Sequence, residues 1–98
     1  MPVSFENSAP VAEATSFTIA AGNTAQQVFP NFKRNYLLVQ NNSDTDMWLE
    51  VGSTPAVGSS LKLVANGGGY VAESNFIPQG AVNIICEVSG KTFYAIQG

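Results

Sequence analysis

Two short apolar runs on either side of a polar bend constrain this chain more than any other feature. The runs are residues 36–39 and 47–51, and the bend is residues 41–46. Both runs are too short and too rich in aromatic and β-branched residues to favour helices, so they predict strands of a hairpin or of neighbouring positions in one sheet. The Asn, Ser and Asp side chains of the bend favour a turn. We therefore expect this pair at the centre of a small all-β domain.

The first run is apolar on both faces. Tyr36 and Leu38 fall on one side of the predicted strand, and Leu37 and Val39 fall on the other. Such a pattern is typical of a strand that is covered on both sides. One face is expected to meet the domain core, and the other an outer loop or another subunit.

The second run has one apolar and one mixed face. Met47, Leu49 and Val51 share one side, and Trp48 and Glu50 share the other. Trp48 is therefore expected to point away from the main apolar row. It would lie either under a loop or in an interface, since aromatic residues are enriched in both places.

Turn signals at regular spacing divide the rest of the chain into further strands. These are predicted at residues 15–20, 25–29, 61–64, 70–73, 81–88 and 91–97. In residues 81–88 the side chains of Val82, Ile84, Cys86 and Val88 are expected inward, and Ser89-Gly90 predicts a hairpin that pairs 91–97 back against 81–88. No stretch of useful length shows the 3.6-residue hydrophobic period of an amphipathic helix. The fold predicted is a single-domain antiparallel β-sandwich or barrel, jelly-roll-like, of about eight short strands.

A chain of 98 residues forms one domain. Residues 1–14 are expected to be an extended N-terminal arm, because Pro2 and Pro10 cannot donate to a ladder, and residues 15–98 form the sandwich. Val3 and Phe5 have large apolar side chains, and their exposure to water would be unfavourable. The arm could dock them on a neighbouring subunit or be a frayed tail, and both alternatives stay open.

Charge is scarce in this sequence. Only 11% of the residues are charged, against roughly 25% in typical domains. Such a surface suits a subunit assembled with neighbours, although a weakly charged soluble monomer remains an alternative. The net charge is −3 with four basic residues and no basic stripe, which argues against nucleic acid as a partner. No apolar run approaches a membrane span, and the N-terminus lacks the features of a signal peptide.

No catalytic, cofactor-binding or metal-ligating residue is predicted. The chain has no histidine, and its single cysteine, Cys86, lies mid-strand on an apolar face, where it is expected to act as a small hydrophobe. The oxygen-rich residues 42–46 favour an Asx-type turn over a calcium site. Trp48, Tyr70 and Tyr94 could form a sugar-stacking platform, but core or interface positions are the commoner use of such residues.

An ordered set of motifs resembles small virion proteins of tailed bacteriophages. It consists of the run RNYLLVQNNS at residues 34–43, the strand and glycine MWLEVG at 47–52, IPQGA at 77–81, and the SGK turn at 89–91. The resemblance covers about residues 28–98. It implies a β-sandwich or barrel structural protein, most often a decoration (cement) protein on the outer capsid surface. Such proteins bind the major capsid protein, often as trimers, and are made in the host cytoplasm.

Related folds also serve as head-fibre bases and as neck or tail components, and a carbohydrate-binding module on the virion is a further alternative. The residues we expect at interfaces are Val3, Phe5, Arg34, Tyr36, Leu38 and Trp48. Arg34 is expected to anchor either the fold or an interface, because a guanidinium can bond several carbonyls at once. Its alternative is a solvated charge at a strand edge.

Overall fold

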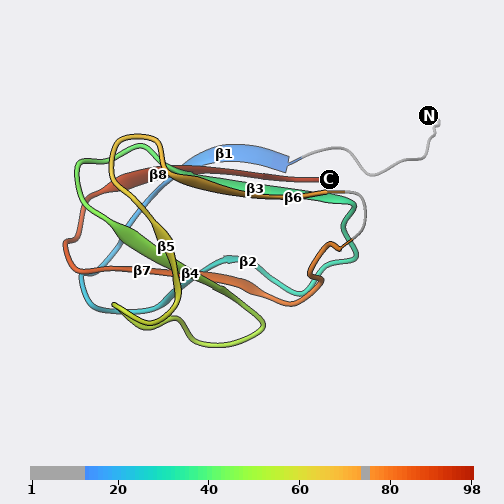
Figure 1. Cartoon of the computed structure of the whole chain (residues 1–98), viewed down its shortest axis with the longest axis horizontal. Coiled ribbons are helices and arrows are strands. Elements are labelled where there is room, and N and C mark those ends of the chain that lie inside the picture. The colour runs from blue at the N-terminus through green and yellow to red at the C-terminus, as the bar shows by residue number, and fades with distance from the viewer. Residues whose placement is uncertain (1–12, 74–75) are drawn as a thin grey trace.

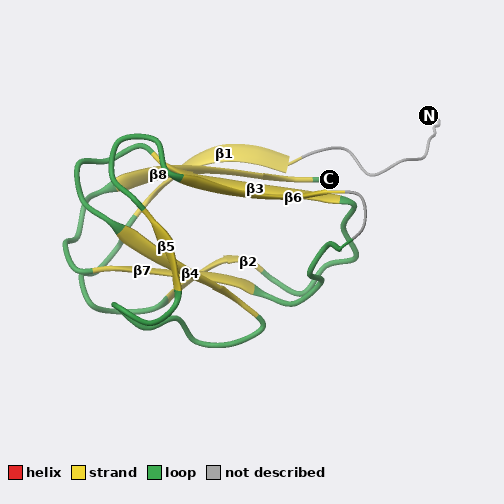
Figure 2. Ribbon diagram, viewed as in Figure 1, coloured by secondary structure: helices red, strands yellow, loops and turns green. Residues whose placement is uncertain are grey.

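The computed structural model describes residues 13–73 and 76–98, and within these ranges it is all-β. Eight antiparallel strands form two four-stranded sheets that face each other (Figures 1 and 2). The strands are β1 (Glu13–Thr18), β2 (Gln26–Phe29), β3 (Tyr36–Asn41), β4 (Met47–Val51), β5 (Leu61–Leu63), β6 (Gly69–Glu73), β7 (Val82–Cys86) and β8 (Thr92–Gln97). The predicted sandwich of eight short strands is confirmed. Residues 1–12 of the expected arm, with Val3 and Phe5, lie outside the described residues.

The chain passes from one sheet to the other at almost every connection. The first sheet has the order β1-β8-β3-β6, and the second has the order β2-β7-β4-β5. Among consecutive strands only β4 and β5 are neighbours in one sheet. This alternation is the connectivity of a jelly roll. It places β1 and β2 at one edge of the sandwich and β6 and β5 at the other.

The two apolar runs that flank the polar bend do not pair with each other. β3 lies in the first sheet between β8 and β6, whereas β4 lies in the second sheet between β7 and β5. The prediction of a hairpin or of neighbouring positions in one sheet is therefore wrong. The bend carries the chain across the sandwich instead, and each run buries its inward apolar face in the space between the sheets.

The hairpin predicted at Ser89-Gly90 is also absent. Gly90 does take a left-handed turn conformation, with a φ of 81°, but β7 pairs with β2 and β4, and β8 pairs with β1 and β3. Strand β7 ends at Cys86, whose carbonyl accepts a 2.7 Å bond from the Asn23 N–H. The inward alternation stops there, and Val88, which was expected inside, is 45% exposed.

The core fills the space between the two sheets. The inward positions predicted for β4 and β7 are confirmed by nearly complete burial of Met47, Leu49, Val82, Ile84 and Cys86. On β3, for which the sequence left the inward face open, the face with Leu37 and Val39 meets the core. Phe17 stacks on Phe93 with ring centroids 5.2 Å apart, and it meets Phe29 edge-on at 6.0 Å. Aromatic contacts of this kind add to the area that the rings bury. They join β1, β2 and β8 across the sandwich.

Two valines near β7 test where the inward alternation ends. Val82 is fully buried and Val88 is half-exposed. Val82→Ala should lower the free energy of unfolding by about 2 kcal/mol, because it removes two buried carbons and leaves a cavity. Val88→Ala should change it by less than about 0.5 kcal/mol. Urea denaturation of the two variants measures both values. Equal losses would show that Val88 belongs to the core.

Candidate functional site

An apolar row crosses the outer face of the first sheet. The register sets Leu38 of β3 directly against Val71 of β6 on one side and Ile96 of β8 on the other. Because side chains alternate along each strand, all three point away from the core. Val71 is 50% exposed, and Leu38 and Ile96 are half-buried. Cross-strand neighbours at this spacing make one continuous surface.

Two tyrosines extend this row. Tyr94 lies two residues before Ile96 on β8, and Tyr36 lies two residues before Leu38 on β3, so both point outward and both are half-buried. The five residues Tyr36, Leu38, Val71, Tyr94 and Ile96 are called the outer apolar face below. Strands β3, β6 and β8 contain a single charged residue, Glu73 at the end of β6. The surface formed by these three strands is therefore poor in charge, and the fourth strand of the sheet, β1, contributes Glu13.

The outer face of the second sheet is different. The loop of residues 52–60 lies on its outer side (Figure 1), and the outward Asn83 side chain donates a 3.0 Å bond to the Ser53 carbonyl in that loop. The same face carries charged side chains that interact with one another. The Lys62 ammonium lies 5.6 Å from the centre of the Trp48 ring and 3.4 Å from a carboxylate oxygen of Asp46.

Trp48 therefore lies on the opposite side of the molecule from Tyr36 and Leu38. The interface residues predicted from the sequence do not form one patch, because β3 and β4 belong to different sheets. The three aromatic residues considered for a sugar platform do not meet either. Tyr94 is on the outer apolar face, Trp48 is on the other outer face, and Tyr70 packs inward against the core.

Arg34 is inside the protein and not on its surface. It is 1% exposed, so the alternative of a solvated strand-edge charge is wrong and the role of fold anchor holds. Its Nε donates to the Gln97 side-chain oxygen at 2.8 Å, its Nη1 to the carbonyls of Pro78 and Gly80, and its Nη2 to the carbonyl of Pro30. Burial lowers the pKa of Arg34, but an arginine keeps its proton in proteins.

Gln79 completes the anchor through the backbone of Arg34. Its side-chain oxygen accepts the Arg34 N–H at 2.6 Å, and its amide nitrogen donates to the Arg34 carbonyl at 3.0 Å and to the Ile77 carbonyl. Together with the bonds of the Arg34 side chain, these bonds tie the β2–β3 connection to the segment before β7 and to the end of β8. Buried carbonyls would otherwise lack donors, and each such loss is costly. The anchor thus holds the end of the sandwich from which β3 starts.

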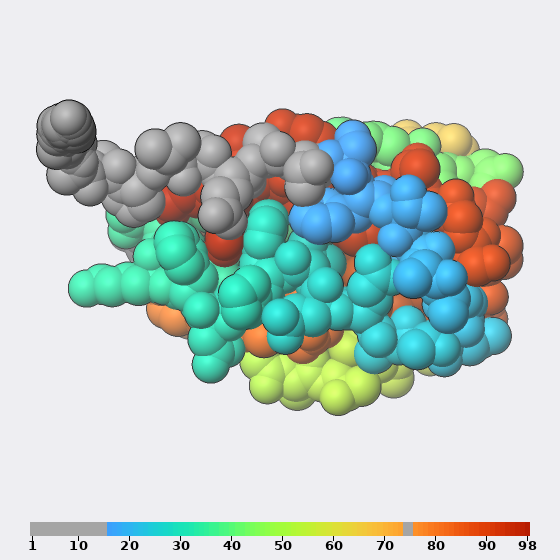
Figure 3. Space-filling model, turned by 180° about the vertical axis from the view of Figure 1, so that it is seen from behind, coloured from blue at the N-terminus to red at the C-terminus, as the bar shows by residue number. Residues whose placement is uncertain are grey.

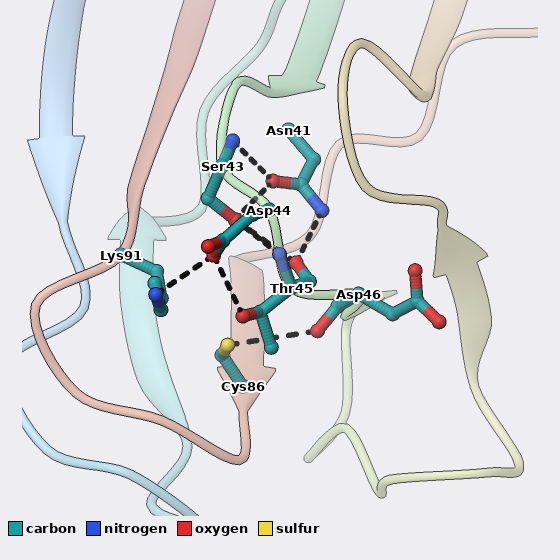
Figure 4. Close-up of polar contacts among 7 residues, drawn as sticks. All are labelled: Asn41, Ser43, Asp44, Thr45, Asp46, Cys86 and Lys91. Carbon is teal, nitrogen blue, oxygen red and sulfur yellow. Dashed lines mark hydrogen bonds and ion pairs between the residues drawn. The ribbon is translucent and has the colours of Figure 1, made fainter.

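The polar bend is held by its own side chains (Figure 4). Asn41 is fully buried, and its amide nitrogen donates to the carbonyls of Thr45 at 2.8 Å and Leu63 at 2.9 Å. Its side-chain oxygen accepts the Ser43 N–H at 2.9 Å and the Ser43 hydroxyl at 2.8 Å. The first of these two bonds is an Asx turn, as the sequence predicts. Within residues 13–73 and 76–98 no group of three or more acidic, Cys or His residues could hold a metal ion.

Two carboxylates of the bend have lowered pKa values. The Asp44 carboxylate accepts a bond from the Lys91 ammonium at 2.7 Å, and this bond is the main reason that the pKa of Asp44 is lowered. The Asp46 carboxylate accepts the Ala65 N–H at 2.8 Å, which is the main reason that its pKa is lowered as well. Cys86 is buried as expected, and its thiol lies 3.5 Å from the Asp46 carbonyl. These contacts fasten the bend to the ends of β5 and β7 and to the start of β8.

The signal that sequence reasoning missed lies in two short strands. Val71, Tyr94 and Ile96 lie on the outer apolar face together with Tyr36 and Leu38. Along β6 and β8 they stand at the positions that alternate with inward-facing residues. The alternation marks them as facing away from Ala72 and Ala95, which are buried. Only the register of β3 with β6 and β8 brings them together.

The role of Arg34 can be tested by replacing it and its neighbour Lys33 in two separate variants. Arg34→Met removes the donors to Pro30, Pro78, Gly80 and Gln97. It should lower the free energy of unfolding by at least about 3 kcal/mol, because several buried acceptors are left unsatisfied. The same change at exposed Lys33 should cost less than about 0.5 kcal/mol. Urea denaturation compares the two variants, and similar losses for both would contradict the assigned anchor.

The ion pair between Asp44 and Lys91 at the bend can be tested through the pKa of Asp44. Lys91→Met removes the main cause of the lowered pKa of Asp44, so that pKa should rise toward its ordinary value, while the pKa of Asp46 should stay lowered. Carboxyl carbon shifts in an NMR titration report both groups. Because the folded-state pKa of Asp44 is depressed, its stabilising contribution is present at neutral pH and is lost as the pH falls through that lowered value. A rise in both pKa values would point to a general loosening of the bend.

Comparisons with protein-family models, with curated proteins and with solved structures found no match to this chain. Within the described ranges, no helix is long and apolar enough to cross a membrane. A jelly-roll sandwich hosts many unrelated functions, so the fold alone does not select one. The surfaces of the chain itself, above all the outer apolar face, carry the functional argument.

Proposed function

We propose that the protein is a non-enzymatic structural subunit of a tailed-phage virion. In this role it decorates and stabilises the outer capsid surface as a trimer, with further copies of itself and the major capsid protein as partners. Two lines of reasoning support the proposal. One is the resemblance over residues 28–98 to small virion proteins, and the other is a surface suited to contact with protein.

The observation that carries the proposal is the outer apolar face. Its central row of Leu38, Val71 and Ile96 spans three adjacent strands that hold one charged residue between them. An exposed apolar patch of this kind, with tyrosines beside it, is typical of an interaction site. The opposite outer face is partly occupied by residues 52–60 and by the Lys62 ion pair. The first sheet is therefore the face we assign to contact between copies.

A decorating trimer would act by mass action. A protein that binds the assembled shell, and not its separate parts, shifts the equilibrium toward the assembled state. Three linked copies bind neighbouring positions together, which multiplies a modest contact made by each. Such a role needs stable folded surfaces and no reactive group. The buried anchor of Arg34 and the self-satisfied bend at Asn41 provide rigid ends for those surfaces.

A carbohydrate-binding module on the virion is the second candidate, and the observation in its favour is Trp48 on an outer face. Aromatic rings bind sugars by offering a flat face to them. The Lys62 ammonium already lies 5.6 Å from the centre of this ring, and neither Tyr70 nor Tyr94 joins it. Protein assembly is the better supported function.

Two valines of similar exposure test the face assigned to self-contact. Light scattering of the purified protein should give a trimer of its 10.3 kDa chain. Val71→Glu, at a position 50% exposed in the single chain, should dissociate it, because a buried unpaired carboxylate is costly. Val88→Glu, at 45% exposure away from this face, should leave the trimer intact. A wild-type protein that stays monomeric at micromolar concentration would overturn the trimer.

The place in the particle needs a separate measurement. Antibodies against the protein, applied to purified particles, should label the outer surface of the head in many copies. Label confined to the neck, the tail or the base of a head fibre would select those alternatives instead. Absence from the particle would overturn the virion role.

A further inference from the structure

One edge of the sandwich is open. Strands β6 and β5 are the last strands of the two sheets and lie at the same edge, on the side that faces the viewer in Figure 1. Within the described residues β6 pairs with β3 on one side and with no strand on the other. Its outer backbone N–H and C=O groups are therefore available to an additional strand.

An apolar groove runs along this edge, between the ends of the two sheets. Its volume is about 250 Å³, and it is lined by Leu49, Glu50, Val51, Leu61, Tyr70, Phe76 and Pro78. Leu61 is 47% exposed and Phe76 is 75% exposed, although both are large apolar side chains. The groove is smaller than the roughly 300–1,000 Å³ typical of small-molecule sites. Its size and lining suit one or two apolar side chains of a polypeptide.

We infer that residues 1–12 of a second copy of this chain add a strand to β6 and place Val3 and Phe5 in this groove. The inference rests on the proposed trimer and names one of its contacts. Val3 and Phe5 are two residues apart, so on an extended segment they point to the same side. Residues 3–9 contain no proline, and this stretch of backbone can donate hydrogen bonds throughout. Strand addition combines such bonds with pockets for alternate side chains.

The topology favours a second copy over the same chain. Residues 1–12 lead into β1, and β1 is the edge strand at the other end of the first sheet from β6. The space-filling view of Figure 3 shows the side of the molecule that holds β1 and β2, opposite to the side with the groove. A segment that leaves one edge and binds the opposite edge of a neighbour makes a head-to-tail contact. Contacts of that type close into rings when the rotation permits, and a trimer is such a ring.

Engineered cysteines in the full-length chain test this contact. The variant Phe5→Cys with Leu61→Cys should form covalent dimers and trimers under mild oxidation with copper phenanthroline, seen on a non-reducing gel and reversed by a thiol. The matched control pairs Phe5→Cys with Val88→Cys, because Val88 and Leu61 are similarly exposed at 45% and 47%. Cys86 is buried in both variants. Cross-linking in the Leu61 variant at least tenfold faster than in the control is the expected result.

The other outcomes overturn the inference. A disulfide formed within one chain would show that residues 1–12 bind their own groove. No cross-link, or equal rates in the two variants, would show that Phe5 does not visit Leu61. As a second measurement, Val3→Ser with Phe5→Ser should weaken trimer association by at least tenfold in sedimentation, and an unchanged association would overturn the contact. A trimer that lacks the cross-link refutes this inference alone, whereas a wild-type monomer refutes the proposed trimer itself.

Discussion

The fold depends on one buried guanidinium. Arg34 lies almost completely inside the protein and donates to acceptors from three separate segments, at Pro30, at Pro78 and Gly80, and at Gln97. A lysine could not replace it, because its single ammonium lacks the planar fork of five N–H donors. Within residues 13–73 and 76–98 no carboxylate forms an ion pair with this cation, which is unusual in an interior. Here the carbonyl dipoles that the crossing segments leave behind supply the compensating charge.

A jelly roll needs such anchors because its chain passes from one sheet to the other at almost every connection. Every crossing exposes backbone groups that a hairpin would have paired, and they must be satisfied in other ways. At one end of the sandwich Arg34 and Gln79 perform this task. At the bend between β3 and β4 it falls to Asn41, which uses both its amide hydrogens and its oxygen. The polar residues of the loops are thus structural elements of this fold.

The local pattern of the sequence predicts the strands and their faces well. Alternation identified the inward residues of β4 and the outward position of Trp48, and it separated the two faces of β3 without telling which of them meets the core. It could not tell which sheet a strand joins, because the period of a strand is the same whichever partner it takes. That is why both expected hairpins were wrong and why Tyr36 and Leu38 lie on a different outer face from Trp48. Arg34 could not be distinguished from its neighbour Lys33 either, since its burial depends on residues more than forty positions away.

The position of β8 has a consequence for how the protein forms in the cell. This strand is the last along the chain, yet it lies inside the first sheet, between β1 and β3, and Glu13 stands opposite Gln97 in the register. Until the ribosome has released β8, β1 has no partner in the sheet and β3 has only β6. Folding of the first sheet therefore waits until β8 has been synthesised, and closing such long loops makes it slow. A nascent chain of this topology presents its apolar strands to solvent for longer than a sheet built from successive hairpins would.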